Sequence, residues 1–184
     1  EVIEFDQCII SVGSRVTKFP MFPFADDRVM DSTDALLLDD IPKRMLVVGG
    51  GIIGLEMATI YDALGSEITI VELGPQIIPA ADKDIVNPLF KKAKKNYANI
   101  FLNTQVTSMS ALKKGIKVEF EGKDAPKTDT FDKVLIAVGR TPNGNLIDAD
   151  KAGVQINDNG FIETDKQMKT NVENIFAIGD VVGQ

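Results

Sequence analysis

One stretch of the chain predicts a complete βαβ unit. The apolar run Met45–Val48 has the length of a buried strand, and a helix is predicted over Ile52–Leu64. Gly65 ends this helix, and Glu67–Val71 follows as a second strand rich in β-branched residues. An acidic residue, Glu72, closes that strand. The pattern is therefore strand, glycine turn, helix, strand and acid in direct succession.

The next segment predicts a longer helix and a third strand. Asp82 is a good N-cap for a helix that continues to about Tyr97. Pro88 lies inside it, and an interior proline costs about 3 kcal/mol. We therefore expect either a kink or a fresh helix start with Asn87 as its cap. Asn99–Leu102 then has the character of a third strand of parallel type.

The following pattern predicts antiparallel strands inserted into the parallel sheet. Gln105–Leu112 and Ile116–Glu121 form a hairpin, and Phe131–Val138 returns as another strand. We predict an α/β fold, a Rossmann-like doubly wound parallel sheet with an antiparallel hairpin or meander insertion. Ligands of such sheets lie beyond the carboxyl ends of the strands. Ala137 and Gly139 are small enough to let a cofactor cross that edge.

The two ends of the chain predict only short elements. A turn at Gly13 and Ser14 releases the chain from its first extended segments. The tail beyond Ala149 alternates turns with short extended pieces. The elements predicted here are extended segments at Val2–Phe5, Gln7–Val12 and Ile175–Ile178, a linker at Thr17–Arg28, and a short helix at Asp34–Leu38 capped by Asp31 or Ser32.

The glycine turn has the residues that a dinucleotide site requires. Gly49 permits a tight turn, Gly51 lets the backbone approach a pyrophosphate, and Gly54 lets the helix pack on the sheet. Glu72 lies close to the ~20-residue spacing at which an acid meets the adenosine ribose hydroxyls. A carboxylate there repels a 2′-phosphate, and residues 73–82 contain no Lys or Arg. The sequence therefore favours NAD over NADP.

Composition narrows the classes of partner. The 184 residues are 44% hydrophobic and 26% charged, which is ordinary for a globular protein. A net charge of −7 with acids spread along the chain predicts no nucleic-acid partner and no anionic membrane surface. The sequence has no apolar run near the ~20 residues that span a bilayer, and its first residues are acidic where a signal peptide is basic. We therefore expect a cytoplasmic location.

The absence of histidine and the single cysteine exclude several chemistries. A chain without histidine has no histidine base and no serine, histidine and aspartate triad. One cysteine allows neither an internal disulfide nor a thiolate zinc cluster. Cys8 lies in an apolar run and is interpreted as a small buried hydrophobe. The sequence thus predicts no catalytic residue and no metal site of its own.

Four motifs occur in a family-specific order. They are CIISVGS from Cys8, VVGGGIIGLE from Val47 with ITIVE after it, LIAVGRTPN from Leu135, and NVENIFAIGD from Asn171. This succession closely resembles the flavin-dependent pyridine nucleotide disulfide oxidoreductases, and among them the dihydrolipoamide dehydrogenases of bacterial type. In that family an NAD domain interrupts an FAD domain, which begins before the segment that resembles this chain and resumes after the NAD domain.

The resemblance implies roles for individual residues. Glu72 would bind the adenosine ribose, Val106 would wall the adenine, and Asp180 would bind the ribityl part of FAD. Glu56 would lie near the nicotinamide half, and the alternative is an ordinary helix carboxylate. The NAD pyrophosphate would be held by Gly49, Gly50, Gly51, Ile52, Ile53 and Gly54, and the nicotinamide half would be lined by Ala137, Val138, Gly139 and Arg140.

The sequence also departs from the family pattern. The FAD glycine motif, the CxxxxC redox disulfide and the histidine and glutamate acid–base pair do not occur in it. We therefore expect a fragment, with residues 1–38 as the end of an FAD-domain segment and linker, 39–148 as the NAD-binding domain, and 149–184 as the return to the FAD domain. Alone it would be colourless and inactive but would bind NAD.

The resemblance further implies a function for the parent protein. It would oxidise dihydrolipoamide and reduce NAD⁺ through FAD, with this chain presenting NAD(H) to the flavin. Its partners would be the rest of the FAD domain, a dimerisation domain and 2-oxo acid dehydrogenase complexes. Two alternatives stay open. One is a stand-alone NAD(H)-binding or sensing module, and the other is an NADH-dependent flavoprotein disulfide reductase with another acceptor.

Overall fold

The computed structural model describes residues 2–183, which divide into two compact units. The central unit is Lys18–Val138. The terminal unit combines the chain up to Thr17 with the chain from Gly139 onward. The domain limits expected from the resemblance, at 38/39 and 148/149, stay a prediction. The compact units instead change at 17/18 and 138/139.

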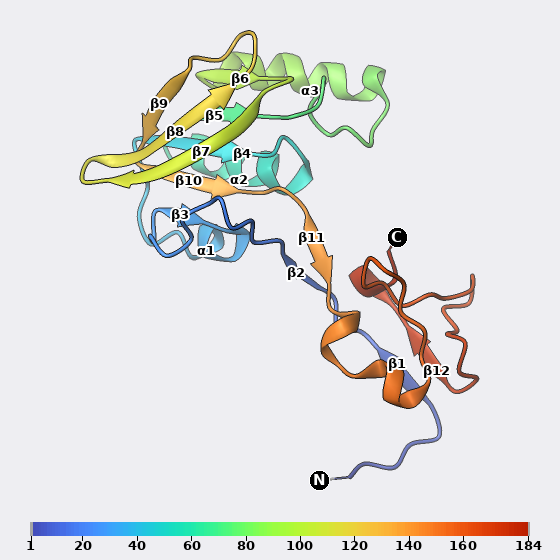
Figure 1. The fold of residues 1–184 in the computed structure, drawn as a ribbon. Coiled ribbons are helices and arrows are strands. Elements are labelled where there is room, and N and C mark those ends of the chain that lie inside the picture. Colours follow the sequence, from blue (N-terminus) through green and yellow to red (C-terminus); the bar gives the residue numbers. More distant parts are fainter. Residues whose placement is uncertain (1, 184) are drawn as a thin grey trace. The chain divides into compact units, whose positions relative to one another are not determined.

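The central unit is built on a five-stranded parallel sheet (Figure 1). Its strand order is β3-β10-β4-β5-β6, and every neighbouring pair is parallel. The chain moves outward from β4 to β5 and β6 on one side and later returns to β10 on the other. The strands are β3 (Val29–Met30), β4 (Arg44–Val48), β5 (Glu67–Val71), β6 (Asn99–Phe101) and β10 (Lys133–Ile136).

Helices cover one face of this sheet. Met45 and Val47 of β4 pack with buried residues of the helices, whereas Leu46 and Val48 belong to the core on the opposite face. Side chains of a strand alternate between its two faces, so a strand buried on both has a continuous apolar run. The helices are α1 (Ser32–Leu37), α2 (Ile52–Ala63) and α3 (Lys83–Asn96). Among residues 2–183 no helix has the length and apolar character needed to cross a membrane.

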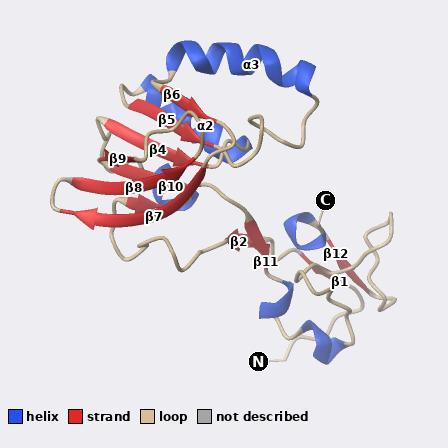
Figure 2. Ribbon diagram, turned by 45° about the horizontal axis from the view of Figure 1, so that its top comes forward, coloured by secondary structure: helices blue, strands red, loops and turns tan. Residues whose placement is uncertain are grey.

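A three-stranded antiparallel sheet covers the opposite face (Figure 2). Its strands are β7 (Gln105–Leu112), β8 (Gly115–Glu121) and β9 (Thr128–Phe131), paired in chain order. Ile116, Val118 and Phe131 bring its buried side chains against those of the parallel sheet. The predicted α/β class and the antiparallel insertion are confirmed, and the insertion is a meander.

The strand predicted over Phe131–Val138 is wrong in its extent. Within this range only Lys133–Ile136 forms a strand of its own, β10, whereas Phe131 is the last residue of β9, which belongs to a different sheet. Asp132 separates the two strands. Asp132 Oδ2 accepts from the Arg44 N–H at 2.8 Å, and the Asp132 N–H donates to the Arg44 carbonyl at 3.0 Å. These reciprocal bonds fix the point where the chain passes from the meander to the parallel sheet.

Two helix predictions have different outcomes. Asp31 caps α1 as predicted, because its Oδ1 accepts from the Thr33 and Asp34 N–H groups at 2.8 and 3.2 Å. The fresh start at Asn87 is wrong, since α3 continues from Lys83 through Pro88. Pro88 has no N–H to donate to the Asp84 carbonyl, four residues earlier in the helix. Asp84 lies in the exposed first turn of α3, where water can bind this carbonyl instead.

The terminal unit contains two pairs of short strands. β1 (Cys8–Ile10) pairs in parallel with β12 (Ile175–Ala177), and β2 (Ser14–Val16) pairs in antiparallel fashion with β11 (Arg140–Pro142). Ser14 therefore starts a strand, and only Gly13, with φ of +64°, keeps the predicted turn conformation. Cys8 is partly exposed and packs against the small core of this unit. Short 3₁₀ helices at Gly144–Leu146, Ala149–Ala152 and Gly179–Val182 complete it.

The ion pair between Arg44 and Asp129 predicts a pH-dependent stability. Burial raises the pKa of Asp129, but hydrogen bonds from Arg44 and the Thr130 N–H outweigh it and place this pKa below 3.8. Such a carboxylate stabilises the fold above its unfolded-state pKa of about 3.9 and loses this effect as pH falls through its folded-state pKa. We expect Asp129→Asn to lower the free energy of unfolding by about 0.5–1 kcal/mol at pH 6.

The measurement is urea denaturation of the unaltered chain and of Asp129→Asn at several pH values. The difference in unfolding free energy should shrink as the pH falls below about 4. A difference that stays constant over this range would show that the ion pair does not account for the effect.

Candidate functional site

The turn from β4 into α2 is packed closely against β10. Gly49 has φ of +105°, and its N–H donates to the Val71 carbonyl at 2.8 Å. A Cβ atom at Gly49 would lie 2.5 Å from the Ala137 carbonyl oxygen. The turn therefore needs glycine here for two reasons, a left-handed backbone and a neighbouring main chain. It lies beyond the carboxyl ends of β4 and β10, where parallel sheets bind ligands.

The other two glycines of the motif have opposite surroundings. A Cβ atom at Gly54 would lie 2.1 Å from the Gly49 carbonyl oxygen, so this position packs α2 onto the turn. A Cβ atom at Gly51 would meet no atom within 4 Å. Gly51 is also the N-cap of α2, where the first N–H groups have no intrahelical partner. The site thus has an open approach to a helix N-terminus, with Ile52 63% exposed beside it.

Glu72 is bound to the glycine turn. Its Oε2 accepts from the Gly50 N–H at 2.7 Å, and its Oε1 accepts from the Gly74 N–H at 2.7 Å. The side chain is half-buried at the carboxyl end of β5. A carboxylate has about four acceptor positions, so these two bonds leave room for further donors. The predicted ribose acceptor therefore has a role within the protein as well.

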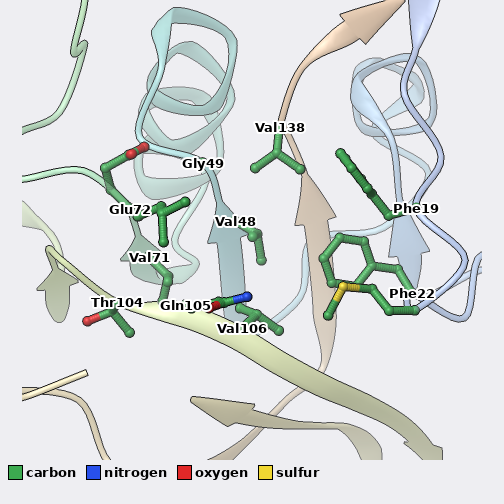
Figure 3. Close-up of a pocket in the computed structure, with 12 residues that line it drawn as sticks. Phe19, Phe22, Val48, Gly49, Val71, Glu72, Thr104, Gln105, Val106 and Val138 are labelled. Atoms are coloured by element: carbon green, nitrogen blue, oxygen red, sulfur yellow. The ribbon is translucent and has the colours of Figure 1, made fainter. Parts of the chain in front are cut away.

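A pocket of about 230 Å³ lies over this edge of the sheet. In Figure 3, Glu72 and Thr104 lie on one side of it and Phe19 and Phe22 on the other, with Val48 and Val138 between them. Its walls are largely apolar, which suits the flat rings of a ligand. The lining residues are Phe19, Met21, Phe22, Val48, Gly49, Val71, Glu72, Leu73, Thr104, Gln105, Val106 and Val138.

The sequence predictions missed part of this wall. Phe19, Met21 and Phe22 were expected in a linker, and they line the pocket instead. Their only signal in the sequence is a cluster of large apolar residues around two prolines, Pro20 and Pro23, which does not indicate what it packs against. Thr104 and Gln105 were also missed, because they lie where the chain leaves the parallel sheet and enters β7.

Most of the predicted site residues lie together in the central unit. The glycine turn and Glu72 share the sheet edge with the buried Val106 and with Ala137 and Val138. Glu56 is exposed on α2. Gly139, Arg140 and Asp180 belong to the terminal unit.

Arg140 and Asp180 meet at Ser14 in the terminal unit. The Ser14 hydroxyl donates to Asp180 Oδ2 at 2.6 Å and accepts from Arg140 Nε at 2.6 Å. Arg140 Nη2 also donates to the Ser14 carbonyl at 2.8 Å. The Arg140 guanidinium is thus engaged with Ser14 and Asp180, which orients the exposed Asp180 carboxylate. The role of Arg140 at the nicotinamide half stays a prediction.

We compared the sequence with models of known protein families. A family described as pyridine nucleotide-disulphide oxidoreductase matches residues 1–184. The chain belongs to this family. The predicted resemblance to the flavin-dependent pyridine nucleotide disulfide oxidoreductases is confirmed, and FAD and NAD(H) are the cofactors of this family.

Several curated relatives within the family are named dihydrolipoyl dehydrogenase. That of Haemophilus influenzae is 54% identical over 182 residues, covering 99% of this chain and 38% of the relative. That of Vibrio cholerae is 53% identical over 184 residues, covering 100% of this chain and 38% of the relative. The chain thus spans about 38% of the length of these oxidoreductases.

Solved structures of other proteins have the same fold. A copper(II) complex of an HOCl-induced flavoprotein disulfide reductase from Escherichia coli matches with a TM-score of 0.87 and 30% identity, over 99% of this chain and 41% of the other. A water-forming NADH oxidase from Lactobacillus brevis bound to NADH matches with a TM-score of 0.82 and 24% identity, over 98% of this chain and 40% of the other. The second likeness concerns the fold alone.

Two glycine substitutions should separate folding from the open surface of the turn. Gly54→Ala places a methyl group against the Gly49 carbonyl, so we expect it to lower the free energy of unfolding by about 1–3 kcal/mol. Gly51→Val adds a side chain in open space at φ of −76°, and we expect a change below about 0.5 kcal/mol. Urea denaturation followed by circular dichroism measures both. Equal losses of stability in the two variants would contradict this account of the turn.

Proposed function

We propose that the central unit binds NAD(H) across the carboxyl edge of its parallel sheet. The observation that carries the proposal is the glycine turn, which is closed toward β10 at Gly49 and open to solvent at Gly51. The open side leads to the N-terminus of α2, where N–H groups and the positive end of the helix dipole attract a pyrophosphate. The residues for this contact are Gly51, Ile52 and Ile53.

The adenosine half would lie on the β5 side of the turn. Glu72 supplies a carboxylate for the ribose hydroxyls, and Leu73 and Val106 supply apolar contacts for the adenine. A 2′-phosphate about 4 Å from this carboxylate would cost on the order of 4 kcal/mol per charge pair near a protein surface, less with salt. The nicotinamide half would lie on the β10 side, near Ala137 and Val138.

The terminal unit would contribute to the flavin site of the parent protein. The Asp180 side chain is 61% exposed and is oriented by Ser14 and Arg140, which suits an acceptor for a hydroxyl of the ribityl chain. The flavin, when bound, supplies the electron transfer between a disulfide and the nicotinamide. A single hydrogen bond to a charged group contributes about 1.5–3 kcal/mol, whereas millimolar binding needs about 4. Asp180 would therefore hold FAD only together with the rest of the FAD domain.

For the parent protein we infer the activity of a dihydrolipoyl dehydrogenase. The support is an identity of 54% to such a relative against 30% to the flavoprotein disulfide reductase structure. The parent would oxidise dihydrolipoamide, pass the electrons through FAD and reduce NAD⁺. It would act in the cytoplasm with a dimerisation domain, bound to 2-oxo acid dehydrogenase complexes.

A second candidate is a flavoprotein disulfide reductase with another acceptor. The likeness in fold to the reductase from Escherichia coli favours it, with a TM-score of 0.87. A stand-alone NAD(H)-sensing module is the third. The full-length parent should reduce NAD⁺ with dihydrolipoamide in a spectrophotometric assay at 340 nm. A parent that oxidises NADH but does not react with dihydrolipoamide would favour the second candidate, and one without flavin would favour the third.

The chain itself should prefer NAD⁺ to NADP⁺. The carboxylate of Glu72 and the absence of Lys and Arg between residues 73 and 82 predict at least about tenfold weaker NADP⁺ binding, which corresponds to about 1.4 kcal/mol. Calorimetric titration of both dinucleotides is the measurement. Gly51→Val is the control, because its side chain would occupy the space of the pyrophosphate and should abolish binding of both. Equal affinity for NAD⁺ and NADP⁺ would refute the assigned role of Glu72.

A further inference from the structure

Hydrogen bonds hold the main chain of Gly50 at both its N–H and its carbonyl. Its N–H donates to Glu72 Oε2 at 2.7 Å, and its carbonyl accepts from the Ile78 N–H at 2.8 Å. A Cβ atom at Gly50 would lie 3.2 Å from Glu72 Cβ and 3.1 Å from Ile77 Cγ2, so the loop after β5 packs directly on the turn. Both ends of the Gly50 residue are therefore fixed by the segment that contains Glu72.

Main-chain hydrogen bonds to neighbouring segments hold Glu72 in place. The Glu72 N–H donates to the Phe101 carbonyl at 2.9 Å, and the Glu72 carbonyl accepts from the Thr104 N–H at 3.0 Å. Glu72 Oε1 accepts from the Gly74 N–H at 2.7 Å, and the Gly74 carbonyl accepts from the Asn103 N–H at 3.0 Å. Hydrogen bonds thus hold both the main chain and the side chain of Glu72 in place. The Glu72 carboxylate can therefore hold the glycine turn in one position.

We propose that Glu72 is a positioning residue for the phosphate-binding turn, in addition to its contact with ribose. The proposal rests on the proposed function. It assigns to the Glu72 carboxylate the hydrogen bond that holds the turn in its binding conformation. The Gly50 N–H belongs to the peptide that joins Gly49 to Gly50, directly before the peptide that carries the Gly51 N–H. The bond from Glu72 therefore helps to set the direction in which the chain enters Gly51 and α2. Removing the carboxylate leaves the Gly50 and Gly74 N–H groups without their acceptor. Each of these part-buried N–H groups then favours a different backbone orientation.

The positioning role of Glu72 affects the design of variants that prefer NADP⁺ to NAD⁺. If Glu72 acted only on the ribose, by binding its hydroxyls and repelling a 2′-phosphate, Glu72→Ala would weaken NAD⁺ binding and improve NADP⁺ binding. Because Glu72 also holds the turn, Glu72→Ala should weaken the binding of both dinucleotides. An acceptor for the Gly50 N–H is therefore needed alongside any cation that is introduced for the 2′-phosphate.

Two ligands separate the positioning role from the ribose contact. ADP offers ribose hydroxyls to Glu72, whereas 2′,3′-dideoxy-ADP has the same adenine and pyrophosphate but no such hydroxyls. We expect Glu72→Gln, which keeps the shape and one acceptor oxygen, to weaken 2′,3′-dideoxy-ADP binding at least about tenfold in calorimetry. Unchanged binding of this ligand would overturn the proposal, since a residue that only contacts ribose cannot affect it.

Nuclear magnetic resonance of the ligand-free chain supplies a second readout. Glu72→Gln leaves one acceptor oxygen for two N–H groups, so the Gly50 or the Gly74 amide proton should move upfield and exchange faster with solvent, while the amides of β7 and β8 stay unchanged. The matched control is Glu163→Gln, which removes the same charge from an exposed position of the terminal unit. It should leave both amides and both affinities as they are.

The two readouts also separate the failure of this proposal from the failure of the proposed function. If the unaltered chain bound neither ADP nor NAD⁺ at millimolar concentration, the proposed function would be wrong. The amide signals of Gly50 and Gly74 would still decide whether Glu72 holds the turn. Signals that are the same in Glu72→Gln and in the unaltered chain would reject the positioning role.

Discussion

The close contact of the Gly49 main chain with its neighbours is the constraint on which the site depends. The Ala137 carbonyl oxygen lies only 2.5 Å from where a Cβ atom of Gly49 would be, and the Gly49 carbonyl oxygen lies only 2.1 Å from where a Cβ atom of Gly54 would be. These contacts bring strand β4, strand β10 and helix α2 together at one point. The open N-terminus of α2 then offers an anion an approach to the turn, and the apolar pocket beside it suits the flat rings of a ligand.

The layers of the central unit keep this point rigid. Helices pack on one face of the parallel sheet and the meander packs on the other, so the sheet is buried on both sides. The loop after β5 then holds the glycine turn through Glu72 and Ile78. A binding turn that is already fixed loses less conformational entropy when a ligand arrives. If the proposed function holds, Glu72 contributes to affinity both through a direct contact and through an ordered backbone.

Much of this arrangement was predictable from the sequence because local signals and burial agree there. The strand at Met45–Val48, the helix after Gly51 and the strand closed by Glu72 follow from apolar runs and glycine spacing. The break at Asp132 and the pairing of β2 with β11 were not predictable, since they depend on contacts between distant residues. The aromatic wall at Phe19 and Phe22 and the bonds of Glu72 to Gly50 and Gly74 depend on tertiary packing in the same way.

The central claim is that the glycine turn of this chain binds the pyrophosphate of NAD(H). Its most direct test is a titration of the isotope-labelled chain with NAD⁺, followed through the backbone amide resonances of the non-proline residues. The account predicts the largest shifts at Gly51, Ile52 and Ile53, with smaller ones at Glu72 and Val106. Shifts that avoid the start of α2, or an unchanged spectrum at millimolar NAD⁺, would contradict it.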